Sequence, residues 1–424
     1  MILAYRIFTT LIYPLLLIFV YLRKLLKKED DKRYKEKILI SHFKIDKKFK
    51  SKLIWFHAAS IGEFRSILPI IDLINNEKEK FNFLITTTTI SSGKLAEVEL
   101  RRFNNVVHRY FPLDVPFLID KFLLLWKPKK IFLVDSEIWP NLIFKSKKYN
   151  IPIALINARL TSRSYKKWIM FPKEAKKIFS LLDLCLCSNK ETEIYLDKLG
   201  SKNIYFKGNI KLIDQIDEKN IENINKDFLL QKRFWFAASI HKEEDAFCLK
   251  THLKLKEKFK DIITIIAPRH IEMIEKIKIL SEKLKLKPQV LSKNESILED
   301  KEIIIINQFG VLKNYFKYAK SVFIGKSMVK SLQNEGGQNP IEAAKLKCKI
   351  YHGPYVYNFQ DIYEMLDKNI ISNKIENFEE LGNKLIKDLI DPIKHSNHEF
   401  YDPLKKLEKD ISIETMKLIN NFLK

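Results

Sequence analysis

The fold is decided by two similar stretches, LIWFHAASIGEF at residues 53–64 and FWFAASIHKEEDAF at residues 234–247. Each contains Trp-Phe, then Ala-Ala-Ser-Ile, and then an acidic residue after a short gap: Glu63 in the first, Glu243 and Glu244 in the second. An apolar run that passes into small residues and then into a helix-forming segment is typical of a strand, a turn and a helix. We therefore expect two similar halves, each beginning with such a unit.

Other short apolar runs are predicted to be buried strands. They are residues 81–86, 130–134, 153–156 and 184–187 in the first half, and 262–266, 303–306, 321–324 and 349–351 in the second. Strands that alternate with helical segments predict α/β domains with doubly wound parallel sheets, whose chemistry lies at the carboxyl ends of the strands. Two such domains facing one another would form a cleft.

The strand pattern, together with the apolar N-terminus and a polar middle segment, gives the expected domain organisation. It comprises an N-terminal membrane anchor at residues 1–30, a first Rossmann-like domain at 31–215, a polar linker at 216–232, a second Rossmann-like domain at 233–395, and a C-terminal helix at 396–424 that packs back on the first domain.

The anchor is predicted from residues 7–22, which carry no charge and are followed by Arg23, Lys24, Lys27 and Lys28. Sixteen residues is short of the roughly twenty that a spanning helix needs, so crossing the membrane and lying in it both stay open. The alternative is a hydrophobic helix docked on the protein. The basic flank would keep the remainder of the chain on the cytoplasmic side.

The net charge of +24 comes mostly from lysine, since only eleven of the 76 basic residues are arginine. The lysines are spread along the whole chain and nucleic-acid-binding motifs are missing, so we expect no nucleic-acid partner. A basic surface favours anionic lipid or phosphorylated substrates. The sequence has no Walker A or G-x-G-x-x-G signature and no metal-ligand spacing, which argues against an ATPase, a dinucleotide enzyme and a metal site.

Residues 325–359 hold four of the ten glycines of a glycine-poor chain. Glycine is used where the backbone needs a positive φ or where a ligand must come close to it. After Gly336 and Gly337, the chain continues with Asn339, Pro340 and Glu342, which predict an N-cap, a first helical residue and a capping box. Such a helix end attracts phosphate, although a well-capped helix without a ligand would have the same sequence.

Three acidic residues follow predicted strands. Glu63 lies at the start of a helix, where a carboxylate is a general base or only a favourable charge near the helix N-terminus. Asp135 and Glu137 come directly after the apolar run at residues 131–134. Two acids at the end of a core strand are costly unless they are paired or functional, and the alternative is a pair of helix-cap acids.

Several basic residues also follow strands. Arg269, next to His270, follows a buried run, and in a lysine-rich chain an arginine there suits bidentate recognition of phosphate. Arg159 and Arg163 form a second cluster in the first half. Lys211 follows a strand-like run and Gly208, and among so many lysines it carries little information by itself.

Taken together, these motifs resemble the Kdo transferases, the 3-deoxy-D-manno-octulosonic acid transferases of glycosyltransferase family 30. The motifs are HAASIGE, FPLDVPFLIDKF, VDSEIWPNLI, NARLTSRS, GNIKLID, AASIHKEE, IAPRH, GGQNPIEAA and GPYVYNFQDI. The resemblance holds from the N-terminus to about residue 370. It implies the GT-B architecture, no metal and no cofactor, and an inner-membrane anchor with the catalytic domains on the cytoplasmic side.

The resemblance also implies roles for single residues. Glu63 aligns with the general base, Glu137 with a carboxylate that assists the transition state, and Lys211 with an assisting lysine. The contacts to CMP align with Pro268, Arg269, Phe309, Gly310, Val311, Asn339, Pro340, Ile341 and Glu342.

The chain departs from the family pattern at three positions near the nucleotide. Lys326 stands where the family usually has the second glycine of Gly-Gly-Ser, Gln338 stands in place of histidine, and Val311 in place of glutamate. These changes alter the nucleotide contacts that the resemblance implies and leave Glu63 and Arg269 in place.

The function implied by the resemblance is transfer of Kdo from CMP-Kdo to the lipid A precursor lipid IVA, with inversion and release of CMP. The expected partners are CMP-Kdo, lipid IVA and inner-membrane lipid. Two alternatives stay open: a GT-B transferase that uses a UDP-sugar in envelope synthesis, and a non-catalytic basic protein that binds acidic lipid.

Overall fold

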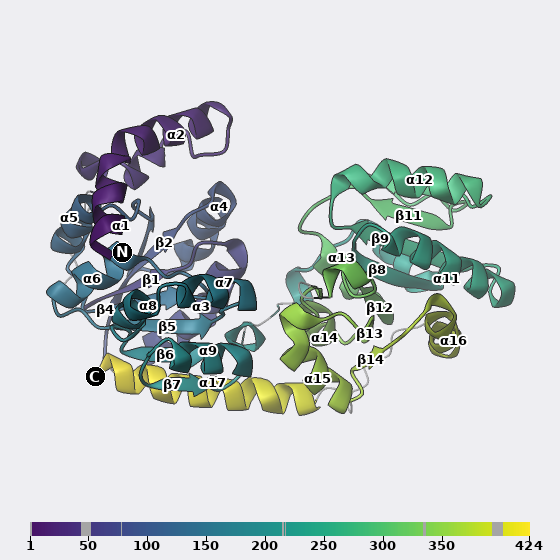
Figure 1. Ribbon diagram of the computed structural model, residues 1–424. Helices are drawn as coiled ribbons and strands as arrows, with labels where there is room; N and C mark the ends of the chain where they lie inside the picture. The colour runs from purple at the N-terminus through teal and green to yellow at the C-terminus, as the bar shows by residue number, and fades with distance from the viewer. Residues whose placement is uncertain are drawn as a thin grey trace. The chain divides into compact units, whose positions relative to one another are not determined.

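The computed structural model describes residues 2–43, 52–77, 79–213, 216, 218–333, 336–391 and 402–424. The chain forms two compact units (Figure 1). Unit 1 comprises Met1–Asp214 and Glu408–Lys424, and unit 2 comprises Gln215–Leu407. The predicted boundaries at residues 215 and 395 lie outside the described residues.

The elements of unit 1 alternate between strands and helices. In chain order they are α1 (Ile2–Leu11), α2 (Tyr13–Leu25), η1 (Tyr34–Lys37), η2 (Ile40–His42), β1 (Leu53–His57), α3 (Ile61–Asn75), β2 (Asn82–Thr87), α4 (Ile90–Glu99), η3 (Leu100–Arg102), β3 (Val106–Tyr110), α5 (Pro116–Trp126), β4 (Lys130–Val134), α6 (Pro140–Lys148), β5 (Ile153–Ala158), α7 (Ser162–Ile169), α8 (Pro172–Phe179), β6 (Leu184–Cys187), α9 (Lys190–Lys198), β7 (Ile204–Phe206) and η4 (Ile210–Leu212), with most of α17 (Asp402–Leu423).

Unit 2 repeats this alternation. Its elements are η5 (Glu218–Asn220), α10 (Lys226–Gln231), β8 (Phe234–Ile240), α11 (Glu244–Lys258), β9 (Ile263–Pro268), η6 (Ile271–Met273), α12 (Ile274–Lys283), β10 (Pro288–Leu291), β11 (Ile303–Ile306), α13 (Leu312–Phe316), β12 (Ser321–Ile324), η7 (Lys330–Leu332), α14 (Ile341–Lys345), β13 (Lys349–His352), η8 (Tyr357–Phe359), α15 (Gln360–Lys368), β14 (Ser372–Lys374) and α16 (Phe378–Asp388).

Each unit contains a parallel seven-stranded sheet. The strand order is β3-β2-β1-β4-β5-β6-β7 in unit 1 and β10-β11-β9-β8-β12-β13-β14 in unit 2, and every pair of neighbouring strands is parallel. The order changes direction between β1 and β4 in the first sheet, and between β8 and β12 in the second. Ligands of such sheets bind at these switch points, outside the carboxyl ends of the strands.

Helices cover both faces of each sheet. In unit 1, Trp55, Leu133 and Leu155 point to one face and share a hydrophobic core with α5, α6, α8 and α9. On the opposite face, the Phe132 ring packs against Phe422 of α17 with ring centres 5.3 Å apart. The strand period of two separates these side chains onto the two faces, and the predicted doubly wound arrangement is confirmed for this unit.

The second sheet is covered in the same way. Trp235, Phe323 and Tyr351 share a core with α11, α12 and α16 on one face. On the other face, Phe236 packs against Tyr315 and Phe316 of α13. The predicted α/β class with two Rossmann-like sheets is therefore confirmed for both units.

The glycines of residues 325–359 serve loop packing in the structure. Gly337 has φ +87°, a conformation that costs glycine little. A Cβ at Gly353 would overlap the backbone of Ser327, so the loops after β12 and β13 meet at backbone distance only because this residue is glycine. The close approach that the composition predicted is therefore, at these positions, between loops of unit 2.

The apolar N-terminal segment forms two helices and no single long one. α1 and α2 are bent by 56° at Ile12, and no one helix of the described chain is long and apolar enough to cross a membrane, although this pair together has the length and composition. Pro14 lies in the first turn of α2; it lacks an N–H and its ring excludes a continuous helix through residues 10–14. No single spanning helix forms in this segment, and the membrane anchor stays a prediction.

The segment predicted as a linker is largely structured. α10 lies within it, and Leu229 of that helix is buried. The Asn225 amide nitrogen donates to Glu295 O at 3.1 Å, and its amide oxygen accepts from Ile297 N at 2.8 Å. Residues 218–232 therefore pack on unit 2 through apolar and asparagine contacts, which their polar composition did not predict.

The C-terminal helix α17 contributes residues 408–424 to unit 1. Lys207, just after β7, forms an ion pair with Glu414 of α17 at 3.3 Å, and Ile411 lies against Gly208. Residues 396–401, the beginning of the segment predicted as this helix, lie outside the described residues.

Candidate active site

The first switch point brings together the acids that the sequence singled out. β1 and β4 are neighbours in the sheet. Glu63 lies in the first turn of α3, directly after β1, whereas Asp135 and Glu137 follow β4. The carboxyl ends of parallel neighbours meet at one edge, so residues 72 and 74 positions apart in the chain share one site.

Glu63 is held by the turn that precedes it. Its carboxylate accepts hydrogen bonds from the Ser60 hydroxyl at 2.7 Å and from Ala59 N at 2.8 Å. In return, the Ser60 hydroxyl accepts from Glu63 N and caps α3. A carboxylate has about four acceptor positions, so this capping arrangement fixes the group and leaves acceptor capacity for a substrate hydroxyl. Glu63 can therefore act as a general base and also place a favourable charge at the N-terminus of α3.

Asp135 and Lys211 form an ion pair, with the carboxylate oxygen and Nζ 3.6 Å apart. Asp135 has a left-handed backbone with φ +61°, which is uncommon for a residue with a side chain and clusters at functional sites. The turn that carries Lys211 is fixed by Asn157, a buried residue of β5 whose amide oxygen accepts from Ile210 N at 3.1 Å. The structure thus places Lys211 beside the acids.

Glu137 receives two side-chain hydrogen bonds on the same oxygen, Oε2. His57 Nε2 lies 3.1 Å from it and Trp139 Nε1 lies 2.7 Å from it. Burial alone would raise the pKa of Glu137, but these donors lower it below its usual value. Glu137 is therefore kept ionised.

The other two acids are shifted in the opposite direction. Burial, together with the negative charges of Asp135 and Glu137, raises the pKa of Glu63. Burial also raises the pKa of Asp135, against the charges of Lys211 and Arg159. A carboxylate with a raised pKa beside one that stays ionised is the pattern that separates a general base from an electrostatic partner.

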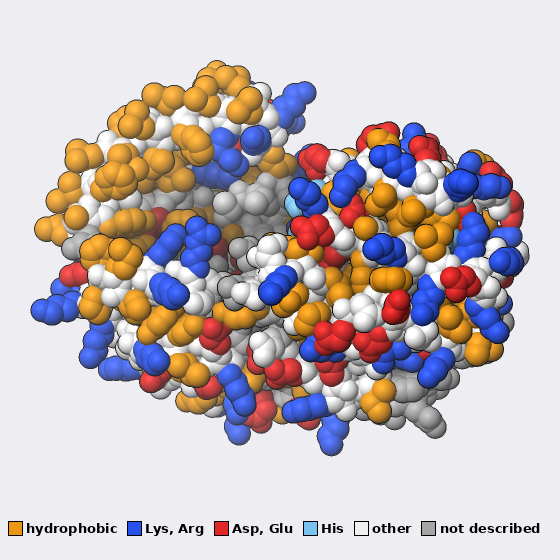
Figure 2. Space-filling model, turned by 45° about the vertical axis from the view of Figure 1, so that its right-hand side comes forward, with side chains coloured by type: hydrophobic (Ala, Val, Ile, Leu, Met, Phe, Trp, Pro, Cys, Tyr) orange, Lys and Arg blue, Asp and Glu red, His pale blue; other side chains and the backbone are white. Residues whose placement is uncertain are grey.

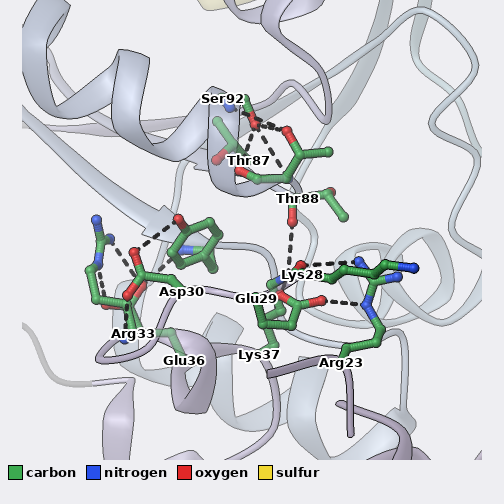
Figure 3. A network of polar contacts seen from close by, with 12 residues as sticks. Arg23, Lys28, Glu29, Asp30, Arg33, Glu36, Lys37, Thr87, Thr88 and Ser92 are labelled. Atoms are coloured by element: carbon green, nitrogen blue, oxygen red, sulfur yellow. Dashed lines mark hydrogen bonds and ion pairs between the residues drawn. The ribbon is translucent and has the colours of Figure 1, made fainter. Parts of the chain in front are cut away.

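A buried polar network joins the segment after α2 to Thr88 (Figure 3), which in turn contacts the turn before Glu63. The buried Lys37 ammonium pairs with the buried Glu29 carboxylate and donates to Thr88 O at 2.8 Å. Thr88 N in turn donates to the carbonyl of Ala59 at 3.2 Å, and Ala59 N donates to Glu63. The segment after α2 is therefore connected to the candidate base through three consecutive contacts.

The same network covers a sheet edge. β3 is an edge strand of the first sheet, and two of its backbone groups bond to side chains of the segment after α2. Tyr110 N donates to the Glu36 carboxylate at 2.8 Å, and Arg33 donates to His108 O at 3.0 Å. Covering an edge in this way prevents it from pairing with other strands.

Unit 2 has a basic cluster at its own switch point. Arg269 follows β9, which Pro268 ends, and its side chain is exposed. His241 follows β8, and its Nε2 lies 3.2 Å from the Gln338 amide nitrogen. Burial and the nearby charges of Lys326, His270 and Arg269 lower the pKa of His241 to about 4. This edge of the sheet is therefore electropositive and suits an anion.

Glu244 organises the loop after β12. Its buried carboxylate accepts from four backbone N–H groups, those of His241, Lys326, Ser327 and Met328, at 2.7–3.0 Å. Lys326, which stands in place of a family glycine, has φ +60°. Glycine adopts this conformation freely, while other residues pay about 1–2 kcal/mol. The loop therefore keeps the backbone shape that glycine would favour.

Phe309, Gly310 and Val311 form an exposed turn between β11 and α13, with the Phe309 side chain 65% exposed. A cavity of about 250 Å³ opens beside this turn. Val311, Gln308, Asn314 and Tyr315 line one part of it, and the 222–225 and 291–295 segments line the remainder.

The predicted capping box at residues 339–342 was wrong in its details. Helix α14 begins at Ile341, and its N-cap is Pro340, with no side-chain cap. Asn339 instead accepts from Ile341 N at 3.0 Å, and Glu342 pairs with Lys313 of α13 at 3.3 Å. A five-residue helix has few aligned peptide dipoles, so charge at this site comes mainly from side chains. The Glu342–Lys313 pair nevertheless brings the 339–342 segment next to the 309–311 turn.

Among the described residues no group of three or more His, Cys, Asp or Glu side chains has the arrangement of a metal site.

Comparison with known proteins gives the family. Residues 32–213 match the family model described as 3-deoxy-D-manno-octulosonic-acid transferase (kdotransferase). The 3-deoxy-D-manno-octulosonic acid transferase of Aquifex aeolicus is 30% identical over 332 residues, which cover 78% of this chain and 84% of the relative. The chain belongs to the Kdo transferase family. The transferase of Rickettsia bellii is 29% identical over 99% of both chains, so the relationship extends over both units.

Solved structures show that this Kdo transferase chain shares its fold with an epimerase and a glycosyltransferase. UDP-GlcNAc 2-epimerase from Neisseria meningitidis has a TM-score of 0.58 at 13% identity, with 88% of this chain and 99% of the other covered. A glycosyltransferase from Rickettsia africae has a TM-score of 0.53 at 11% identity, with 88% and 97% covered. At these identities the likeness concerns the fold alone, and it confirms the GT-B-like architecture.

The site contains two residues to which sequence reasoning gave no role, His57 and Trp139. Both lie within motifs that the family resemblance uses. Their function depends on the pairing of β1 with β4 and on the direction of single hydrogen bonds. The one available signal was a histidine at the end of an otherwise apolar strand.

Proposed function

We propose that this protein is an inverting glycosyltransferase that moves Kdo from CMP-Kdo to lipid IVA in lipopolysaccharide core biosynthesis and releases CMP. The observation that carries the proposal is membership of the Kdo transferase family, combined with the group of acids at the first switch point. Glu63, with its raised pKa, and the ionised Glu137 supply the chemistry that such a reaction needs.

In the proposed reaction, a glucosamine hydroxyl of the lipid acceptor attacks the anomeric carbon of Kdo. Glu63 takes the hydroxyl proton as the new C–O bond forms. The bond between the anomeric carbon and the phosphate oxygen breaks, and its electron pair leaves with CMP. Glu137 stabilises the positive charge that develops on the sugar. Lys211 forms an ion pair with the neighbouring Asp135, with its Nζ 3.6 Å from the carboxylate oxygen.

The nucleotide is proposed to bind to unit 2. Its single phosphate would contact Arg269, near His241 and Lys326, where the positive charges lower the pKa of His241. The exposed turn at Phe309, together with the cavity beside it, offers an aromatic surface and polar groups for a pyrimidine base. Val311 would contribute a backbone contact in place of the acidic side chain that the family usually has here.

The anchor is proposed to lie at the cytoplasmic face of the inner membrane. α1 and α2 expose large apolar side chains, which Figure 2 shows gathered over this part of unit 1. They include Leu3, Ile7, Phe8, Leu11, Leu15, Ile18, Phe19 and Leu22, each at least half exposed. Such a face followed by basic residues is suited to the interface of an anionic membrane.

The test is transfer of labelled Kdo to lipid IVA in detergent, with CMP-Kdo generated in situ and EDTA present. A labelled product establishes the donor, the acceptor and independence of added metal together, and its mass counts the Kdo residues added. If no product forms, and UDP rather than CMP raises the thermal unfolding temperature, the protein is a UDP-sugar transferase and the proposal is wrong.

A further inference from the structure

We propose that His57 is a positioning residue that fixes Glu137 as a hydrogen-bond acceptor, and that Thr86 selects the His57 tautomer that makes this possible. The inference rests on the proposed role of Glu137 and adds two residues to that site. His57 ends β1, and Thr86 lies directly opposite it in β2. Both side chains are fully buried.

Trp55 determines which partner donates in each hydrogen bond of this group. An indole nitrogen can only donate, and Trp55 Nε1 lies 2.9 Å from Thr86 Oγ1. That hydroxyl therefore accepts from Trp55, and its own proton is available for a second partner. His57 Nδ1 lies 3.0 Å from Thr86 Oγ1, so the hydroxyl donates to Nδ1 and the ring proton is left on Nε2.

The protonated nitrogen faces Glu137. His57 Nε2 lies 3.1 Å from Oε2, the oxygen that also receives the Trp139 indole N–H at 2.7 Å. The His57 ring is stacked on Phe111 with ring centres 3.9 Å apart, which fixes the plane of the ring. A row of directed hydrogen bonds thus runs from Trp55 through Thr86 and His57 to Glu137.

The alternative tautomer is disfavoured by the same geometry. With its proton on Nδ1, His57 could donate to Thr86 O, which lies 3.2 Å away. That carbonyl already accepts from Ala58 N at 3.0 Å, and the Nε2 lone pair would then face the Glu137 carboxylate. The Thr86 hydroxyl proton would also lose its acceptor.

The other charged groups around Glu137 do not replace the hydrogen bonds from His57 and Trp139. The ionisable groups near it are Glu63 of α3, Asp135 at the end of β4, His57 itself, and Lys211 and Arg159, which act on Asp135. Glu63 and Asp135 are acids and oppose ionisation of Glu137, while Lys211 is paired with Asp135. His57 and Trp139 are therefore the groups that offset burial of this carboxylate.

The test compares Thr86→Val with Thr86→Ser. Valine keeps the shape and removes the hydroxyl, whereas serine keeps the hydroxyl. We expect Thr86→Val to lower kcat about tenfold, the order of one hydrogen bond to a charged group, with KM for CMP-Kdo unchanged. The acid limb of its pH–rate profile should move to higher pH, because Glu137 then protonates more readily. Thr86→Ser should behave like the unmodified protein.

A merely structural role would lower activity without moving the acid limb. An unmoved limb in Thr86→Val, or equal behaviour of the valine and serine variants, would overturn the proposal.

A second measurement does not depend on activity or on the Thr86 variants. Nitrogen-15 NMR of histidine-labelled protein reports the tautomer, with the His57 signal assigned from its loss in His57→Gln. We expect a proton on Nε2 and none on Nδ1 at neutral pH. A proton on Nδ1, alone or on both nitrogens, contradicts the role of Thr86. If the unmodified protein transfers no Kdo, the proposed function fails, while the tautomer result still decides the arrangement of His57.

Discussion

Glu63 and Glu137 have carboxyl groups of one chemical type with pKa values shifted in opposite directions. The difference comes from their surroundings, since Glu137 has two side-chain donors on one oxygen, whereas Glu63 is buried and faces two negative charges. The position of each glutamate after a strand could be predicted from the sequence. The assignment of one glutamate as base and the other as ionised partner could not be predicted, because it depends on which carboxylate oxygen accepts each hydrogen bond.

The pKa of Glu63 should fall in Glu137→Gln. The negative charge of Glu137 contributes to the raised pKa of Glu63, so a neutral glutamine lets Glu63 ionise at lower pH. We expect a lower kcat and an acid limb of kcat/KM displaced to lower pH. This is the reverse of the shift in Thr86→Val, where Glu137 is still present and still has to ionise. An acid limb that stays in place would show that Glu137 does not act on the base.

Lys211 should be replaceable by arginine but not by methionine. Its contact with Asp135 is an ion pair at 3.6 Å, and both side chains are only partly exposed. Methionine has a similar volume and removes the charge, so Asp135 would be left without this partner and its pKa would rise further. We expect Lys211→Met to lower kcat at least tenfold and Lys211→Arg to retain more activity. Equal activity of both variants would contradict an electrostatic role.

At the scale of elements, the inner strands were predictable and the edge strands were mostly not. Eight of the ten inner strands coincide with the predicted apolar runs to within two residues, and the other two, β1 and β8, begin at the first residue of the two similar stretches. The four edges are β3, β7, β10 and β14, of which only β7 corresponds to a run noted as strand-like. Edge strands are buried on fewer sides and lack a continuous apolar pattern. The burial patterns of β7 and β10 show this, since most of their residues are only half buried.

The buried Glu29–Lys37 pair is expected to fix the segment after α2 to unit 1. Both side chains are about 5% exposed. Removing Lys37 leaves the buried Glu29 carboxylate paired with Arg23, whose side chain is 39% exposed, so Lys37→Met should destabilise unit 1 by about 2 kcal/mol. Replacing both residues in Glu29→Leu/Lys37→Met should recover a large part of this loss. The midpoint of urea unfolding measures the change, and a double variant less stable than Lys37→Met would contradict this account.

The exposed face of α1 and α2 should bind membranes. Phe8→Glu/Leu15→Glu places two charges on side chains that are 58% and 66% exposed. Because both sites face solvent, we expect folding to be unaffected and co-sedimentation with anionic vesicles to fall. Ile194→Glu is the matched control, since Ile194 is 52% exposed on α9. If Ile194→Glu lowers vesicle binding as much as the double variant, the exposed face of α1 and α2 is not a specific membrane-binding surface.

At the scale of the whole molecule, the proposed reaction assigns different roles to the two units. The candidate base and its partners lie in unit 1, and the candidate nucleotide contacts lie in unit 2. The repeated Ala-Ala-Ser-Ile stretches accompany the first strand of each sheet, β1 and β8, beside the switch point, which is why the sequence predicted two halves. Comparison of the two stretches did not predict that Glu63 faces the site while Glu244 is buried under four backbone N–H groups.

The most direct test of this division measures CMP binding and Kdo transfer in Glu63→Gln and Arg269→Ala. We predict that Glu63→Gln transfers no Kdo yet is stabilised by CMP as strongly as the unmodified protein. Arg269→Ala should lose the stabilisation by CMP while unit 1 stays folded. If Glu63→Gln retains transfer, or loses CMP binding to the same extent as transfer, Glu63 is a structural residue and the account of the active site is wrong.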